Sequence, residues 1–176
     1  MRVLVTYAST HGSTRGIAEH IATRMRDSGI SADCVPIHEA QSVAGFDAVV
    51  VGSAIHDQAW LPEASQYLAT HANELVRKPV WLYSVGMPGA IARPLRKMAM
   101  REGSKVVASF ATTIRPRDTQ LFSGVVRKRQ FPLVSRAVLR LMGGHYGDFR
   151  NWHEIDTWTA RICSELLQTS APPAPR

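Results

Sequence analysis

The sequence has few cysteines and no long apolar runs. Its 176 residues include two cysteines, Cys34 and Cys163, which lie far apart and form no CxxC pair. Two distant cysteines cannot supply a disulfide framework, so we expect buried, free thiols in a reducing cytoplasm. No apolar run approaches the ~20 residues that span a bilayer, and the start at Met1-Arg2 shows no signal-peptide pattern. The sequence therefore predicts a cytoplasmic protein without a transmembrane helix.

Acidic residues are scarce relative to basic ones. The chain has 14 Asp and Glu against 21 Lys and Arg, which gives a formal net charge of +7. Such an excess attracts anions, whether a carboxylated small molecule, an acidic lipid or nucleic acid. A nucleic-acid surface would interleave aromatic with basic residues in a repeated pattern, and the sequence has no such pattern. We therefore rank nucleic acid last among these partners.

Strand and helix patterns alternate along the chain. Short apolar runs predict five strands, at residues 3–7, 32–37, 47–51, 80–84 and 105–114. Amphipathic patterns predict helices at residues 17–25, 62–76, 93–102 and 152–167. Strands that alternate with helices form a parallel sheet covered on both faces, and ligands bind at the edge where the strands end. The sequence therefore predicts an α/β fold.

Residues 115–147 do not fit this alternation. They contain one acid, Asp118, and many basic side chains: Arg115, Arg117, Arg127, Lys128, Arg129, Arg136 and Arg140. Residues 131–142 have the pattern of a short helix, ended by Gly143-Gly144. We interpret residues 115–147 as a basic insertion before the last helix, within a single domain of residues 1–169. Residues 170–176 read as a flexible tail.

The turn after the first strand is rich in hydroxyl groups and contains no acid. It consists of Ala8, Ser9, Thr10, His11, Gly12, Ser13 and Thr14, and leads directly into a helix. Unpaired N–H groups at a helix N-terminus carry partial positive charge, so a phosphate there accepts these donors and the hydroxyl groups. The sequence has neither GxGxxG after the first strand nor GxxxxGK(S/T), which disfavours a classical dinucleotide site and a P-loop NTPase. Ordinary helix capping by Ser and Thr is the alternative.

Residues 6–14 (TYASTHGST) resemble the FMN-phosphate loop of the flavodoxins, and the likeness covers nearly the whole chain. It implies a flavodoxin-like, doubly wound, five-stranded parallel sheet of order 2-1-3-4-5. It also implies FMN as the cofactor, with a deazaflavin as the alternative. In that family the loops after strands three and four enclose the isoalloxazine ring. The matching segments are residues 52–56 and 84–89. Within them, the resemblance implies that Ser53, Ala54, Ile55, Ser84, Val85, Gly86 and Met87 bind the cofactor.

Two features depart from an electron-carrying flavodoxin. Many such proteins are acidic and stack aromatic side chains on both flavin faces. This chain is basic, and the loop after its fourth strand has no aromatic residue. Trp60 is the candidate ring-stacker, and burial under the following helix is the alternative. His56 is a candidate proton shuttle, or else an ordinary surface histidine. His145 and His153 have no third ligand at a fitting spacing, so we expect no metal site.

The second half of the chain resembles the bacterial flavodoxin-type protoporphyrinogen oxidases. Residues 83–85, 139–144 and 148–152 carry the likeness, together with the basic insertion. It implies oxidation of protoporphyrinogen IX in heme biosynthesis, with electrons passed to menaquinone at the inner face of the cell membrane. Propionates or anionic lipid would suit the basic residues Arg127, Lys128, Arg129, Arg136 and Arg140. An electron-transfer flavodoxin without a substrate, an NAD(P)H-dependent quinone reductase and assembly into a homo-oligomer stay open.

Overall fold

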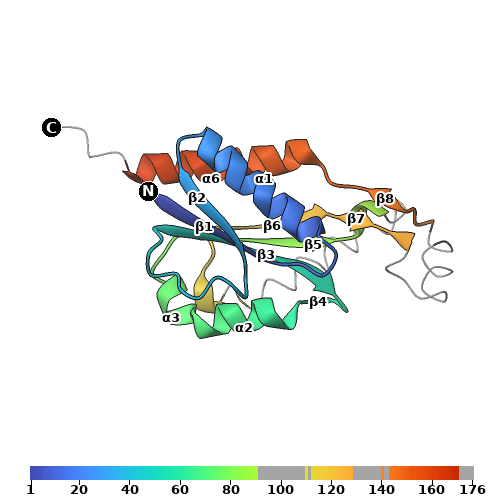
Figure 1. Cartoon of the computed structure of the whole chain (residues 1–176), viewed down its shortest axis with the longest axis horizontal. Coiled ribbons are helices and arrows are strands. Elements are labelled where there is room, and N and C mark those ends of the chain that lie inside the picture. Colours follow the sequence, from blue (N-terminus) through green and yellow to red (C-terminus); the bar gives the residue numbers. More distant parts are fainter. Residues whose placement is uncertain (91–109, 111, 129–139, 141–142, 171–176) are drawn as a thin grey trace.

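The chain folds into three layers, with a mostly parallel sheet between two pairs of helices. The structure is a computed structural model that describes residues 1–90, 110, 112–128, 140 and 143–170. Helices α1 (Ser13–Asp27) and α6 (Trp152–Ser170) cover one face of the sheet (Figure 1). Helices α2 (Pro62–Thr70) and α3 (Ala72–Leu75) cover the other. No helix in these described ranges is long and apolar enough to cross a membrane.

Five strands of the sheet run parallel to one another. They are β1 (Arg2–Ala8), β2 (Ser31–Pro36), β3 (Ala48–His56), β5 (Val80–Gly86) and β6 (Asp118–Ser123). Their order is β2-β1-β3-β5-β6, and the two-residue β4 (Ala59–Trp60) pairs antiparallel with the end of β3. Apart from β4, this is the predicted order 2-1-3-4-5. The predicted flavodoxin-like α/β fold is therefore confirmed.

The fifth parallel strand lies later in the chain than predicted. Residues 110 and 112–114 are helical, so the strand prediction for residues 105–114 is wrong where the structure describes it. Strand β6 lies instead within residues 115–147, and its Gln120 pairs with Tyr83 of β5. An edge strand has one neighbour and tolerates polar residues, and in β6 only Phe122 is fully buried. The basic insertion predicted at residues 115–147 therefore includes a strand of the main sheet, β6.

The rest of residues 115–147 is described only in part. A short pair of strands, β7 (Val125–Val126) and β8 (Gly147–Asp148), runs antiparallel beside the main sheet. The helix predicted at residues 131–142 lies outside the described residues except for Arg140, which is helical. The helix predicted at residues 93–102 lies outside them altogether. Helix α6 extends through Ser170, the first residue of the predicted tail, and residues 171–176 lie outside the described residues.

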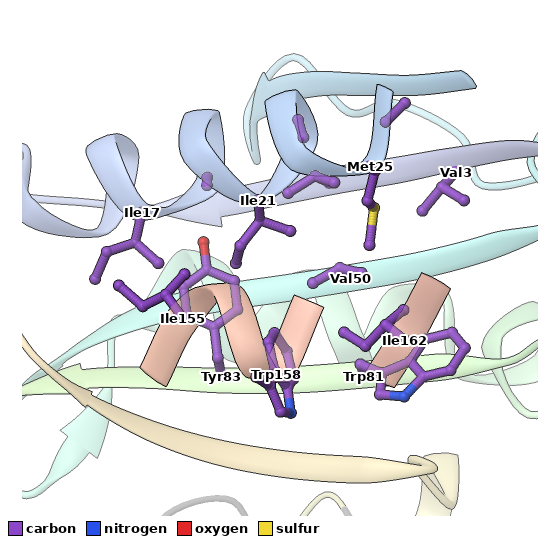
Figure 2. Close-up of a cluster of buried hydrophobic side chains, with 14 of the residues drawn as sticks. Val3, Ile17, Ile21, Met25, Val50, Trp81, Tyr83, Ile155, Trp158 and Ile162 are labelled. Carbon is purple, nitrogen blue, oxygen red and sulfur yellow. The ribbon is translucent and has the colours of Figure 1, made fainter. Parts of the chain in front are cut away.

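The larger part of the core lies between the sheet and the pair α1 and α6 (Figure 2). Buried apolar residues recur along α1 at helical spacing: Ile17, Ala18, Ile21, Ala22 and Met25. They meet Trp81 and Tyr83 from β5. Trp158 of α6 packs edge-on against Phe122 at 5.6 Å and donates a hydrogen bond from Nε1 to Asp118 at 2.8 Å. This one side chain thereby fixes α6 to the edge strand.

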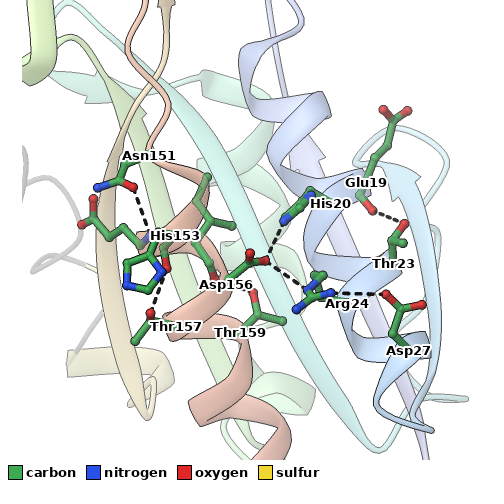
Figure 3. A network of polar contacts seen from close by, with 12 residues as sticks. Glu19, His20, Thr23, Arg24, Asp27, Asn151, His153, Asp156, Thr157 and Thr159 are labelled. Atoms are coloured by element: carbon green, nitrogen blue, oxygen red, sulfur yellow. Dashed lines mark hydrogen bonds and ion pairs between the residues drawn. The ribbon is translucent and has the colours of Figure 1, made fainter.

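Polar contacts join α1 to α6 on the outside of this core (Figure 3). Asp156 of α6 contacts Nε2 of His20 at 2.7 Å and Nε of Arg24 at 3.1 Å. The hydrogen bond with His20 is the main cause that holds the pKa of Asp156 below its usual value, and the charge of Arg24 acts in the same direction. The ionised carboxylate is therefore favoured in the folded state.

We expect the stabilisation from Asp156 to depend on pH. A pKa that is lowered by folding gives stability that is present above the unfolded-state value of about 3.9 and is lost as pH falls through the folded-state value. Asp156→Asn should therefore lower Tm at neutral pH, and the difference from the wild type should shrink as pH falls below about 4. Thermal unfolding followed by circular dichroism across this range measures it. A difference that stays constant with pH would contradict the assignment.

Candidate functional site

A cleft of about 470 Å³ opens where the parallel strands end, at the edge predicted to bind a ligand. Its volume falls in the range of about 300–1,000 Å³ that is usual for small-molecule sites. The loops after four strands line it: Ser9, Thr10, His11, Ser13 and Thr14 after β1; Ala54, Ile55, His56 and Asp57 at β3; Val85, Gly86 and Met87 at β5; Gly124 and Val125 after β6. Hydroxyl groups gather at one end of this set, and apolar side chains supply much of the rest.

Four of the predicted cofactor-binding residues do not line the cleft. Gly12 is the N-cap residue of α1, whereas Ser53, Ser84 and Trp60 are buried. Trp60 is 3% exposed and donates a hydrogen bond from Nε1 to Oγ of Ser84 at 2.8 Å. Oγ of Ser53 accepts a hydrogen bond from the N–H of Leu61 at 3.1 Å. Trp60 is therefore buried, as the alternative interpretation predicted, and does not form a wall of the cleft.

The N-terminus of α1 has the properties of a phosphate site. Gly12 precedes the helix at φ 86°, in the left-handed region that glycine adopts readily, and its N–H donates to Oγ of Ser9 at 3.1 Å. The first turn has neither a side-chain cap nor an acid. Thr14 is 1% exposed, and its hydroxyl group has no hydrogen-bond partner among the described residues. A buried hydroxyl group without a partner costs about 1–3 kcal/mol, and a phosphate oxygen would satisfy it.

Direct bonds hold three of these loops together. Oγ of Ser13 accepts a hydrogen bond from the N–H of Val125 at 3.0 Å, and the N–H of Gly124 donates to the carbonyl oxygen of Gly86 at 2.9 Å. A Cβ at position 124 would lie 2.9 Å from Cγ1 of Val85, so this approach requires glycine. The sequence interpretation missed Gly124 and Val125 because it placed the fifth strand too early. A glycine at the end of the TQLFS run was the available signal.

Arg150 connects the β7–β8 pair to the phosphate end of α1. Its Nε donates to Oδ1 of Asp148 at 2.9 Å, and its guanidinium lies 4.5 Å from the centre of the Trp152 ring. This hydrogen bonding lowers the pKa of Asp148 and raises that of Arg150. A Cβ at Gly16 would lie 2.8 Å from Nη1 of Arg150, so the arginine packs on the first turns of α1. The sequence interpretation did not assign it a role.

A tight turn carries His56 at the mouth of the cleft. Asp57 (φ 48°) and Gln58 (φ 61°) both adopt the left-handed conformation, and His56 pairs with Ala59 across them. This is a two-residue type I′ turn, in which Asn-Gly is the preferred pair. A non-glycine residue in this conformation costs roughly 1–2 kcal/mol. Oδ2 of Asp57 lies 3.1 Å from Nδ1 of His56.

The predicted basic residues lie apart from the cleft lining or outside the described ranges. Arg127 and Lys128 follow β7 and are exposed, and so is Arg140. None of these three is among the residues that line the cleft. Arg129 and Arg136 fall outside the described residues.

The chain belongs to the flavodoxin domain family, whose sequence model matches residues 4–149. Protoporphyrinogen IX dehydrogenase (quinone) of Escherichia coli K12 is 24% identical to it over 174 residues, with 92% of this chain and 94% of that protein covered. Among solved structures, an archaeal flavodoxin is similar with a TM-score of 0.60 at 13% identity, covering 95% of this chain and 99% of that chain. A mutant flavodoxin from Pseudomonas aeruginosa has a TM-score of 0.61 at 12% identity, with 95% and 99% covered. At these identities the solved structures support the fold alone.

Proposed function

We propose that the chain is an FMN-dependent oxidoreductase that oxidises protoporphyrinogen IX and passes the electrons to a quinone. The observation that carries the cofactor assignment is the phosphate end of the cleft, where α1 begins without an acid and the Thr14 hydroxyl group has no partner among the described residues. Bound FMN supplies the acceptor for hydride or electrons. The E. coli relative, named for this substrate and acceptor, supports the reaction.

The described residues would bind the phosphate of FMN at one end of the cleft and its ring at the other. Ser9, Thr10 and Thr14 present hydroxyl groups for a phosphate, together with the N-terminal N–H groups of α1. Ile55, Val85 and Met87 present apolar surface for a planar ring, and Met87 is 40% exposed. Among the described residues that line the cleft there is no Phe, Tyr or Trp. A ring held in this way keeps a face accessible to a second molecule.

Charge supports an anionic substrate or surface beside this cleft. The net charge of +7 is opposite to that of many electron-carrying flavodoxins, and complementary charge guides the choice of partner. Arg127 and Lys128 are exposed directly after β7, whose first residue, Val125, lines the cleft. We place the propionates of the substrate, or anionic headgroups of a membrane with its quinone, near this segment.

Anaerobic turnover tests the proposed function. Purified, FMN-loaded protein should convert protoporphyrinogen IX to fluorescent protoporphyrin only when a menaquinone analogue is added. The control is the spontaneous rate without protein and the rate without quinone. Bound, reducible flavin that produces no acceleration would contradict the enzyme assignment and favour an electron-transfer protein. Rapid reduction of the flavin by NADPH would instead favour a nicotinamide-dependent quinone reductase.

A further inference from the structure

The pair His56 and Asp57 lies at the cleft and has a geometry suited to proton transfer. His56 and Asp57 both line the cleft, and Nδ1 of His56 lies 3.1 Å from Oδ2 of Asp57. In the part of the chain that the structure describes, the other ionisable side chain that lines the cleft is His11, in the loop after β1. We propose that His56 is the catalytic base that accepts the substrate's proton and that Asp57 is its positioning residue. The inference rests on the proposed function and adds the group that removes the proton.

The reaction requires a base because each two-electron oxidation removes a proton from the substrate in addition to a hydride. Conversion of a porphyrinogen to a porphyrin takes three two-electron steps, which together remove four hydrogens from the methylene bridges and two from pyrrole nitrogens. In each step a hydride from a bridge would leave to bound FMN, which supplies the hydride acceptor, and one proton would leave from the substrate. This proton is the one assigned to His56, and the quinone would take up the two electrons with two protons. A positioned histidine is the side chain best suited to receive a proton near neutral pH.

The carboxylate of Asp57 decides which ring nitrogen of His56 can act. A negative charge 3.1 Å from Nδ1 favours a proton on that nitrogen. Nε2 is then the nitrogen that remains to accept the substrate's proton. The side chain of His56 is 69% exposed, so the proton can pass onward to water. The base therefore lies at the cleft and is connected to solvent.

The turn conformation fixes this pair at the end of β3. Asp57 and Gln58 occupy the two left-handed positions of a type I′ turn, where Asn-Gly would be the less strained choice. Non-glycine residues held in this conformation cluster at functional sites, where neighbouring structure maintains them. Here Ile55 pairs with Trp60 and His56 with Ala59, directly across the turn. The turn therefore holds the backbone of both residues at the end of β3, and the exposed Asp57 carboxylate lies 3.1 Å from the imidazole ring.

The chain offers a matched control pair in His38 and Glu39. Nε2 of His38 lies 3.6 Å from Oε1 of Glu39, and the His38 side chain is 77% exposed. Neither residue lines the cleft that holds His56. Substitution of His38 or Glu39 therefore changes a similar exposed pair without touching the proposed site.

Turnover of the FMN-loaded variants tests the base. His56→Ala should lower kcat by about 10²-fold with little change in KM, should keep stoichiometric FMN, and should be accelerated by added imidazole. Asp57→Asn should lower kcat by about tenfold, and His38→Ala should match the wild type. Wild-type turnover by His56→Ala, or a slow variant that imidazole does not accelerate, would overturn the role of His56. No turnover by the wild type is a different outcome, because it overturns the proposed function before any variant is compared.

Nitrogen-15 NMR of the histidine rings tests the positioning role without any turnover. The ring shifts of neutral His56 should report a proton mainly on Nδ1 in the wild type and a shift of population towards Nε2–H in Asp57→Asn. Glu39→Gln should leave the His56 signals unchanged. Identical tautomer populations in the wild type and Asp57→Asn would show that Asp57 does not position the ring.

Discussion

Replacement of Ser9, Thr10 and Thr14 by alanine should strip FMN from the purified protein. All three side chains line the phosphate end of the cleft, and the Thr14 hydroxyl group is buried without a partner among the described residues. A hydrogen bond to a charged group contributes about 1.5–3 kcal/mol. Loss of three such bonds should raise the Kd for FMN by about 10³-fold or more. Fluorescence titration of the apoprotein with FMN measures the change.

A triple substitution needs a control that removes equally many hydroxyl groups elsewhere. Thr23, Thr157 and Thr169 each donate a hydrogen bond to the carbonyl oxygen four residues earlier in their helices. None of them lines the cleft, so the control triple variant should bind FMN as tightly as the wild type. Stoichiometric flavin in the Ser9, Thr10 and Thr14 variant, with a normal circular dichroism spectrum, would show that the phosphate does not bind at this turn.

The sequence predicts the central strands well because they are buried on both sides. Residues 3–7 and 48–51 read as nearly continuous apolar runs, and they lie within the interior strands β1 and β3. The edge strand β6 begins with Asp118, Thr119 and Gln120, so its polar residues hide the pattern. A two-residue strand such as β4 leaves no periodicity at all. Burial on both faces, rather than strand propensity, therefore made the core strands predictable.

The site is predictable where its chemistry is local in the sequence. The hydroxyl groups of residues 9–14 can be found because the loop and the helix that form the phosphate end are contiguous. Arg150 and Val125 reach this end from more than a hundred residues away, and only the fold shows their contacts with it. The position of Trp60 could not be predicted from the sequence, because a tryptophan near a binding loop can either line the cleft or pack in the core. Its hydrogen bond to Ser84 shows that it packs in the core.

Gly52 lies in β3 beside the buried ring of Tyr83, and this ring leaves no room for a side chain at position 52. It pairs directly with Tyr83 on the neighbouring strand, and a Cβ at position 52 would lie 2.0 Å from Cζ of that ring. Tyr83 is fully buried, which raises its pKa well above the usual value, and its protonated hydroxyl group lies 3.5 Å from the carbonyl oxygen of Thr14. The ring also packs against Phe122 and Trp158, at 5.9 and 6.0 Å. It cannot move aside without disturbing those contacts or the first turn of α1.

Gly52→Ala should therefore lower the free energy of unfolding by about 3 kcal/mol or more, at the upper end of what overpacking costs. Urea unfolding followed by circular dichroism measures the loss. Gly45→Ala is the matched control, because the nearest atom to a Cβ there is Nη1 of Arg2 at 3.9 Å, and we expect a change within about 0.5 kcal/mol. Adding Tyr83→Ala to Gly52→Ala should cost less than the sum of the two single substitutions, since the smaller residue removes the clash. Additive losses would mean that the two side chains do not compete for the same space.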